Sequence, residues 1–145
     1  MINLYIQASI YNSGGDVLFN AVRLILEKAH GKENVYSCHQ SEYKIKDKRP
    51  YHLVQVDKPS IKLAEASTKI FSTIRPIDEI KKEVEENVDK DWEDFLWWKN
   101  KDNAIAFNYW QIQTLLPVVV AITANEIGLL EKVENEVINI ANEVK

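Results

Sequence analysis

The sequence predicts an α/β fold, with α+β as the alternative, in a single small domain over residues 1–145. The 145 residues, 46% hydrophobic and 28% charged, have the size and composition of one globular domain. Four Gly and four Pro are few for the tight turns of an all-β protein. Strand-like segments that precede helical patterns predict a short, mainly parallel sheet of 3–4 strands with five helices and a mostly helical C-terminal half.

The first strand and the first helix are predicted next to each other at the start of the chain. Residues 2–10 alternate apolar and polar side chains well enough for a strand, and residues 12–16 form a turn cluster. Asp16 is a good N-cap for a helix over 17–30, whose apolar residues share one side, and Gly31 stands where a helix commonly ends.

Two further strands and a second helix follow. Residues 35–40 and 51–57 are strand candidates, separated by the polar loop 46–50. A Pro-Ser pair at 59–60 opens a predicted helix over 61–74, which ends before Pro76 because a residue that precedes proline resists helical geometry.

The clearest predicted element is an acidic amphipathic helix over 76–98. Its apolar residues recur at spacings of 3, 4, 4, 4 and 3, from Ile77 to Phe95. Pro76 suits the first helical position, and Asp78 and Glu79 complement the positive helix start. A short helix is predicted next, over 104–113.

Residues 115–122 have two interpretations. Pro117 followed by three valines favours a buried strand, which would complete the parallel sheet. In the α+β alternative this segment continues the preceding helix through a proline kink. Thr123 and Glu126 have capping-box spacing, so the last helix is predicted to begin there.

Composition narrows the cellular setting and the partners. The lone Cys38 cannot form an intramolecular disulfide, and neither a signal peptide nor a membrane-spanning stretch is apparent, so we expect a cytoplasmic protein without a membrane partner. A net charge of −4 argues against broad nucleic-acid binding. Residues 44–75 carry eight basic and three acidic side chains, whereas residues 76–94 carry three basic and nine acidic ones.

The predicted parallel sheet would bring three loops together at the carboxyl ends of its strands, where ligands of such folds bind. A nucleotide-like ligand is the candidate. The glycines would let the backbone approach such a ligand closely, and the acidic side chains would bind a ribose hydroxyl or act as a general base. The simpler interpretation of the first loop is a turn with an N-cap. The candidate ligand-binding residues are Ser13, Gly14, Gly15, Asp16, Asp57, Ser60, Asn125 and Glu126.

The order of these elements is broadly similar to that of nucleoside deoxyribosyltransferase-like proteins. The Pro-Ser motif of that family continues with glycines and a catalytic Glu at fixed spacing, whereas residues 59–65 here lack the glycines and place Glu65 one position early. We therefore do not assign the chain to this family, and the similarity only adds to the nucleotide hypothesis.

An unusual density of aromatic residues gives the other candidate site. All four Trp fall within nineteen residues, and neighbouring helical positions lie about 100° apart, so Trp97 and Trp98 cannot both face one stripe. Together with Trp110 they are candidates for a partner surface. Cys38, His39 and His52 lack zinc-motif spacing, so no metal and no cofactor are predicted.

No motif specifies a reaction, so the sequence does not decide whether the chain is an enzyme. The first hypothesis is a protein-binding or inhibitor-type module, which acts through the aromatic and acidic surface on a protein partner or on a second copy of itself. The alternative is a small α/β enzyme or sensor for a nucleotide or nucleoside, with its site at residues 13–16.

Overall fold

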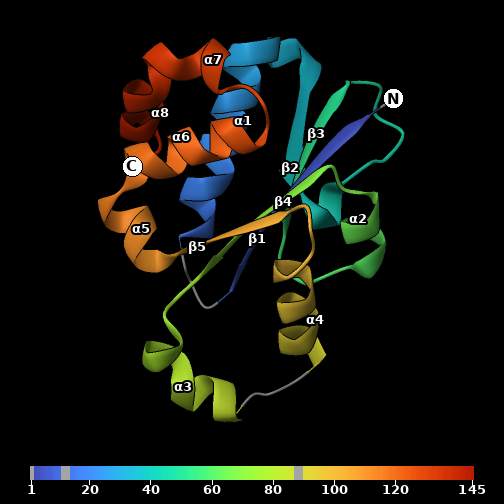
Figure 1. Ribbon diagram of the computed structural model, residues 1–145. Coiled ribbons are helices and arrows are strands. Elements are labelled where there is room, and N and C mark those ends of the chain that lie inside the picture. The colour runs from blue at the N-terminus through green and yellow to red at the C-terminus, as the bar shows by residue number, and fades with distance from the viewer. Residues whose placement is uncertain (1, 11–13, 87–89) are drawn as a thin grey trace.

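A computed structural model, which describes residues 2–10, 14–86 and 90–145, has at its centre a five-stranded, entirely parallel sheet (Figure 1). The strand order is β2-β3-β1-β4-β5. The strands are β1 (Asn3–Ile10), β2 (Val35–His39), β3 (Tyr51–Val56), β4 (Lys69–Ile74) and β5 (Ala104–Asn108). The α/β class and the parallel sheet are therefore confirmed, although the sheet has five strands and not the predicted 3–4.

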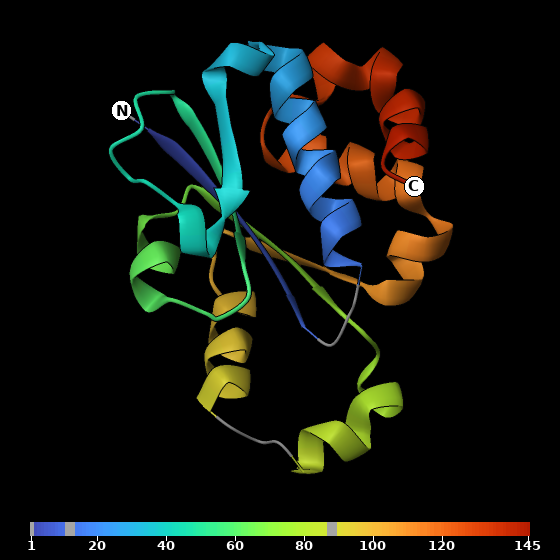
Figure 2. The same ribbon diagram turned by 180° about the vertical axis from the view of Figure 1, so that it is seen from behind.

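Helices cover both faces of this sheet (Figures 1 and 2). The helices are α1 (Gly15–His30), α2 (Ile61–Ala66), α3 (Ile77–Glu86), α4 (Lys90–Lys99), α5 (Tyr109–Thr114), α6 (Leu116–Glu126), α7 (Leu130–Val133) and α8 (Val137–Glu143). Short 3₁₀ turns occupy Lys32–Asn34, Gln40–Glu42 and Glu134–Glu136. The mostly helical C-terminal half is confirmed.

The central strand β1 separates two hydrophobic layers. Tyr5 faces the larger layer, where it packs with residues of α1, α6 and α8, and Leu4 and Ile6 face the smaller one, with Ala64 of α2 and Trp98 of α4. A strand buried on both faces needs apolar side chains at successive positions, which the Leu-Tyr-Ile run of β1 provides.

The predicted helix over 61–74 is wrong in its second half. It divides into α2 and the buried strand β4, which pairs in parallel with β1, with Ile70 opposite Ile6. The stretch from Lys69 to Ile74 is rich in β-branched and aromatic side chains, which suit a strand between two neighbours. Ile70 and Ile74 lie four residues apart, a spacing that is typical of a helix, and this led to the wrong prediction.

The predicted helix over 104–113 is also part strand. Residues Ala104–Asn108 form β5, and α5 begins only after Asn108. The Asn108 side chain accepts a hydrogen bond from the Gln111 backbone N–H at 2.9 Å, and the Gln111 side chain accepts one from Asn108 N–H, a capping box that fixes where the helix begins.

Residues 115–122 are helical, so the favoured strand interpretation is wrong. Pro117 lies in the first turn of α6, where its missing N–H breaks no helical hydrogen bond. Val119 and Val120 are buried against the larger core, and this packing outweighs the strand preference of valine. Thr123 lies inside α6 and does not cap a new helix.

The predicted helix over 76–98 appears as two helices, α3 and α4, which point in different directions (Figures 1 and 2). Residues 87–89, which include Val88 of the predicted stripe, lie outside the described residues. Ile80 of α3 and Phe95 of α4 are both buried and pack with Ile74 of β4. The two residues of the predicted stripe whose side chains are described, Ile80 and Phe95, thus face the core, but from two separate helices.

None of the helices in the described ranges combines the length and the apolar character that crossing a membrane would require.

His52 of β3 is buried in a polar network that anchors the loop between β2 and β3. Its Nε2 lies 3.1 Å from the carbonyl oxygen of Asp47, which can only accept, so the ring proton sits on Nε2. The Tyr43 hydroxyl then donates to Nδ1 at 2.8 Å. Burial lowers the pKa of His52, so the folded protein holds a neutral imidazole.

We therefore expect the free energy of unfolding to fall as the pH drops below about 6.5, because the unfolded chain takes up a proton on His52 more readily than the folded one. Above that pH both states hold His52 neutral, and it contributes no pH dependence. Urea unfolding between pH 5 and 8 measures this slope. His52→Asn keeps an acceptor near the Nδ1 position and should flatten the profile, whereas an unchanged slope would assign it to other groups.

Candidate functional site

The carboxyl ends of the central strands form a crevice because their connections leave toward opposite faces. The chain after β1 enters α1 on one face, whereas the neighbouring strands β3 and β4 lead to α2 and to α3 on the other side (Figure 1). Loops that part in this way leave space outside the sheet edge, and ligands of open parallel sheets bind in such crevices.

A pocket of about 440 Å³ lies at this edge, between the ends of β1 and β3 and the start of α1. This volume is within the range of small-molecule sites. Its lining residues are Ser9, Gly14, Gly15, Asp16, Val17, Gln55 and Asp57. Gly14, Gly15, Asp16 and Asp57 were predicted from the sequence, so the structure does bring the first two predicted loops together.

The two glycines let α1 start directly against β1. Gly14 has φ of +83°, and a Cβ on it would stand 2.9 Å from Ile112 Cγ2. A Cβ on Gly15 would stand 2.4 Å from both Cβ and Oγ of Ser9 and 2.9 Å from Gln7 Nε2. The glycines are therefore required by packing, and this close approach brings the first turn of α1 to the pocket.

A row of polar side chains crosses the sheet beneath the pocket. Gln7 of β1 and Gln55 of β3 are paired in register, and Gln55 Nε2 donates to Gln7 Oε1 at 3.3 Å and to Asp16 Oδ1 at 2.7 Å. Gln7 is fully buried, and its Nε2 has no hydrogen-bond partner within the described ranges. Sequence reasoning missed both glutamines, although a glutamine in the middle of an apolar strand was visible in the sequence.

A second polar group lies at the rim of the pocket, where His39 at the end of β2 meets Asp57 after β3. His39 Nε2 lies 2.5 Å from Asp57 Oδ2. The Ser41 backbone N–H donates to His39 Nδ1 at 3.2 Å, which leaves the ring proton on Nε2, directed at the carboxylate. An imidazole oriented by a carboxylate can transfer protons near neutral pH.

The remaining predicted ligand residues do not line this pocket. Ser60 is the N-cap of α2, where its Oγ accepts from Leu63 N–H at 3.3 Å. Asn125 and Glu126 lie at the end of α6, near the opposite edge of the sheet, where Glu126 pairs with Lys69 at the start of β4 at 2.9 Å. Their predicted convergence is wrong because 115–122 is a helix. Ser13 lies outside the described residues.

Metal-ligating and thiol chemistry find little support. Within residues 2–10, 14–86 and 90–145, no group of three or more His, Cys, Asp or Glu side chains is placed to hold a metal ion. Burial raises the pKa of the Cys38 thiol, which disfavours the nucleophilic thiolate near neutral pH.

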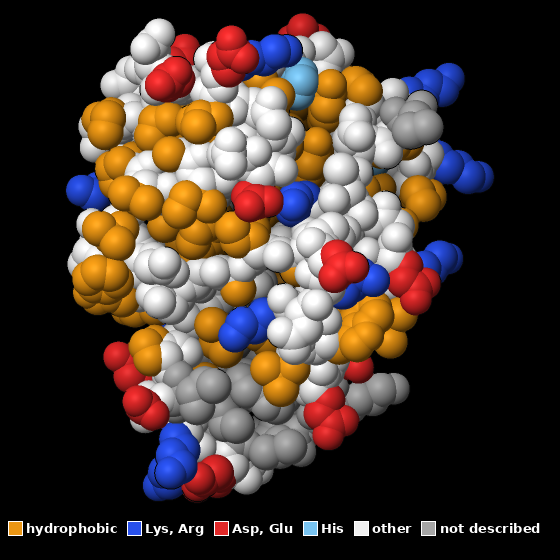
Figure 3. All heavy atoms as spheres, viewed as in Figure 1, with side chains coloured by type: hydrophobic (Ala, Val, Ile, Leu, Met, Phe, Trp, Pro, Cys, Tyr) orange, Lys and Arg blue, Asp and Glu red, His pale blue; other side chains and the backbone are white. Residues whose placement is uncertain are grey.

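The three tryptophans of the predicted partner surface do not form one surface. Trp98 is fully buried between α4 and the sheet, whereas Trp97 is 41% exposed with Lys101 Nζ 4.6 Å above its ring. Trp110 is 58% exposed on the distant helix α5, where hydrophobic side chains gather over α5, α6 and α8 (Figure 3). The prediction that Trp98 contributes to a surface is wrong.

No protein-family model and no curated protein sequence matches this chain. Seventeen chains of solved structures are similar to it in fold. One is retinol dehydratase in complex with androsterone and the inactive cofactor PAP, with a TM-score of 0.63 and 12% sequence identity. The similarity covers 99% of this chain and 64% of that chain, so the present chain spans less than two thirds of the length of its structural neighbour. At this identity the likeness shows a shared fold.

This comparison contradicts the first hypothesis, that of a protein-binding or inhibitor-type module. The fold is shared with an enzyme that was crystallised with the inactive cofactor PAP, and this finding overturns the first hypothesis. The dispersal of the three tryptophans removes the surface on which the first hypothesis depended.

Replacing Gly15 by Ala should lower the free energy of unfolding by about 1–3 kcal/mol, because the new methyl group overlaps Ser9. Urea denaturation measures this loss. In a Ser9→Gly background the same substitution should cost less, because both clashing Ser9 atoms are gone. An equal cost in both backgrounds would contradict the proposed contact.

Substitutions of Trp98 and Trp110 should differ clearly in their effect on the free energy of unfolding. Trp98→Ala should cost about 3–5 kcal/mol, because it empties a fully buried site in the smaller core. Trp110→Ala, on an exposed position of α5, should change the free energy of unfolding by less than about 0.5 kcal/mol. Chemical denaturation followed by circular dichroism compares the two, and similar losses would show that Trp110 is also a core residue.

Proposed function

We propose that this chain is a small α/β enzyme or sensor that binds a nucleotide or nucleoside in the pocket between β1, β3 and the start of α1. The observation that carries this proposal is the position of that pocket, at the carboxyl ends of central parallel strands and against a glycine turn. The fold shared with retinol dehydratase, which was crystallised with PAP, supports the same ligand class.

The lining offers complementary groups for such a ligand. The first turn of α1 provides backbone N–H donors at Gly15 and Asp16, and Ser9 adds a hydroxyl. The carboxylates of Asp16 and Asp57 accept hydrogen bonds from hydroxyl or amino groups.

A cytoplasmic location stays a prediction from the sequence.

The His39–Asp57 pair is the candidate for chemistry on the bound ligand. It lies at the pocket rim, and Asp57 belongs to both the pair and the lining. In an enzyme of this design, the imidazole would move a proton to or from a ligand hydroxyl, while Asp57 holds the ring in its tautomer. In a sensor the same pair would only orient the ligand.

Thermal denaturation in the presence of a nucleoside and nucleotide panel, with PAP included, tests the proposal. At least one member should raise the melting temperature in a concentration-dependent way, because a ligand that binds only the folded state stabilises it. Asp57→Ala should weaken that ligand tenfold or more, which corresponds to about 1.4 kcal/mol, by isothermal titration.

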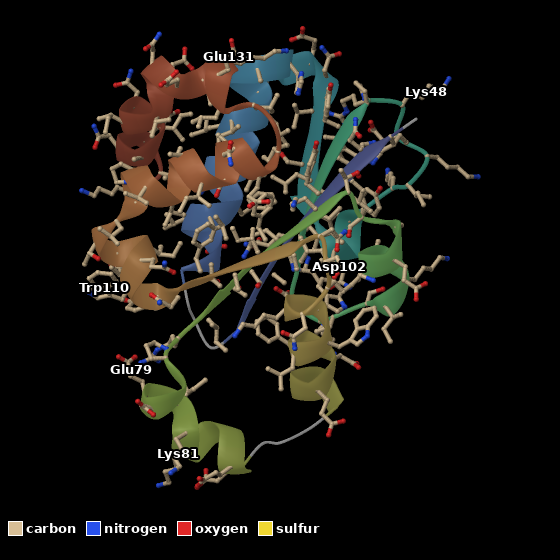
Figure 4. All side chains as sticks on the ribbon, in the orientation of Figure 1. Lys48, Glu79, Lys81, Asp102, Trp110 and Glu131 are labelled. Carbon is tan, nitrogen blue, oxygen red and sulfur yellow. The ribbon has the colours of Figure 1, made fainter. Side chains whose placement is uncertain are left out.

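Asp57 is exposed, so its substitution should leave the fold intact. Glu131→Gln on α7, at the opposite end of the molecule, is the control and should bind as the unchanged protein does (Figure 4). Stabilisation by no member of the panel would reject the proposed function. A ligand that binds Asp57→Ala undiminished would place the site elsewhere.

A further inference from the structure

The charge of the pocket distinguishes between the parts of a nucleotide that it could hold. Two carboxylates line it, those of Asp16 and Asp57, and no Lys or Arg is among its described lining residues. Arg75, which follows β4 at the same edge, pairs with Glu79 at 3.3 Å, and the side chain of Lys58 is exposed outside the lining. A phosphate placed here would meet two negative charges and, among the described lining residues, no cation.

Asp16 carries the strongest argument, because it occupies the first turn of α1, where a phosphate would otherwise find free N–H donors. Its Oδ1 accepts a hydrogen bond from Gln55 Nε2 at 2.7 Å, which holds the carboxylate between the first turn of α1 and β3. Within the described ranges no hydrogen bond reaches its Oδ2. The helix start therefore presents an acceptor where phosphate binding needs donors.

The buried amide of Gln7 lies in the layer beneath the pocket. Its Nε2 is fully buried directly beneath Gly15, and it has no acceptor among the described residues. Gln7 is not among the lining residues, so the charged acceptors that a ligand meets here are the carboxylates of the pocket walls. A sugar hydroxyl can donate to a carboxylate, whereas an ionised phosphate oxygen can only accept.

We propose that this pocket binds the sugar hydroxyls of a nucleoside and excludes a phosphate from the start of α1. The inference rests on the proposed function and narrows its ligand to the unphosphorylated sugar. Asp16 selects for the sugar by accepting a hydroxyl proton and selects against the phosphate by charge. Gln55 is a positioning residue, since it acts through Asp16.

Isothermal titration of adenosine, guanosine, cytidine and uridine, each against its 5′-monophosphate, tests this inference at pH 7.5 and low salt. The best nucleoside should bind at least tenfold tighter than its monophosphate. Asp16→Asn keeps the acceptor for Gln55 but removes the charge, so it should weaken the nucleoside several-fold and tighten the monophosphate. This opposite movement of two affinities cannot arise from a loss of folding.

Glu131→Gln changes the net charge by the same amount at a remote site and should alter neither affinity (Figure 4). Tighter binding of the monophosphate than of the nucleoside by the unchanged protein would overturn the inference while it supports the proposed function. An Asp16→Asn variant in which both affinities rise, or both fall, would also overturn the inference. Binding of neither ligand class would reject both proposals.

Discussion

The burial of β1 on both faces is the constraint on which the rest of this structure depends. Its apolar side chains alternate between two cores, so helices must cover both sides of the sheet. The chain meets this need by sending α1 to one face and α2 to the other, and the parting of these connections opens the crevice. Gly15 brings α1 so close to Ser9 that the crevice ends at a helix start.

The polar groups at this edge are costly unless they serve a purpose or satisfy each other. Gln7 occupies a core position of β1 and Gln55 a half-buried position of β3, and they offset part of their desolvation by hydrogen bonds between the two side chains and from Gln55 to Asp16. One amide donor remains unmatched within the described ranges. The two carboxylates and the nearby imidazole at this edge are the groups on which the proposed ligand site depends.

The shared fold with retinol dehydratase and the chemistry of the pocket bear on different questions. The fold explains why a ligand would bind at this edge, since the strand order decides where connections diverge. The side chains explain which part of a ligand fits, and here Asp16 occupies the helix start that would otherwise attract a phosphate. A shared fold therefore does not by itself decide the chemistry of a site.

The sequence by itself determined the α/β class, the strand–glycine turn–helix unit at residues 2–30 and four of the pocket residues, because these features depend on local periodicity and turn chemistry. The tertiary structure decided that Lys69–Ile74 is a strand, because it is buried between two neighbouring strands, and that Leu116–Glu126 is a helix, because its burial outweighed the strand preference of valine. It alone brought Gln7, Gln55 and His39 to the site. Their alignment depends on strand register, which connects residues far apart in the chain.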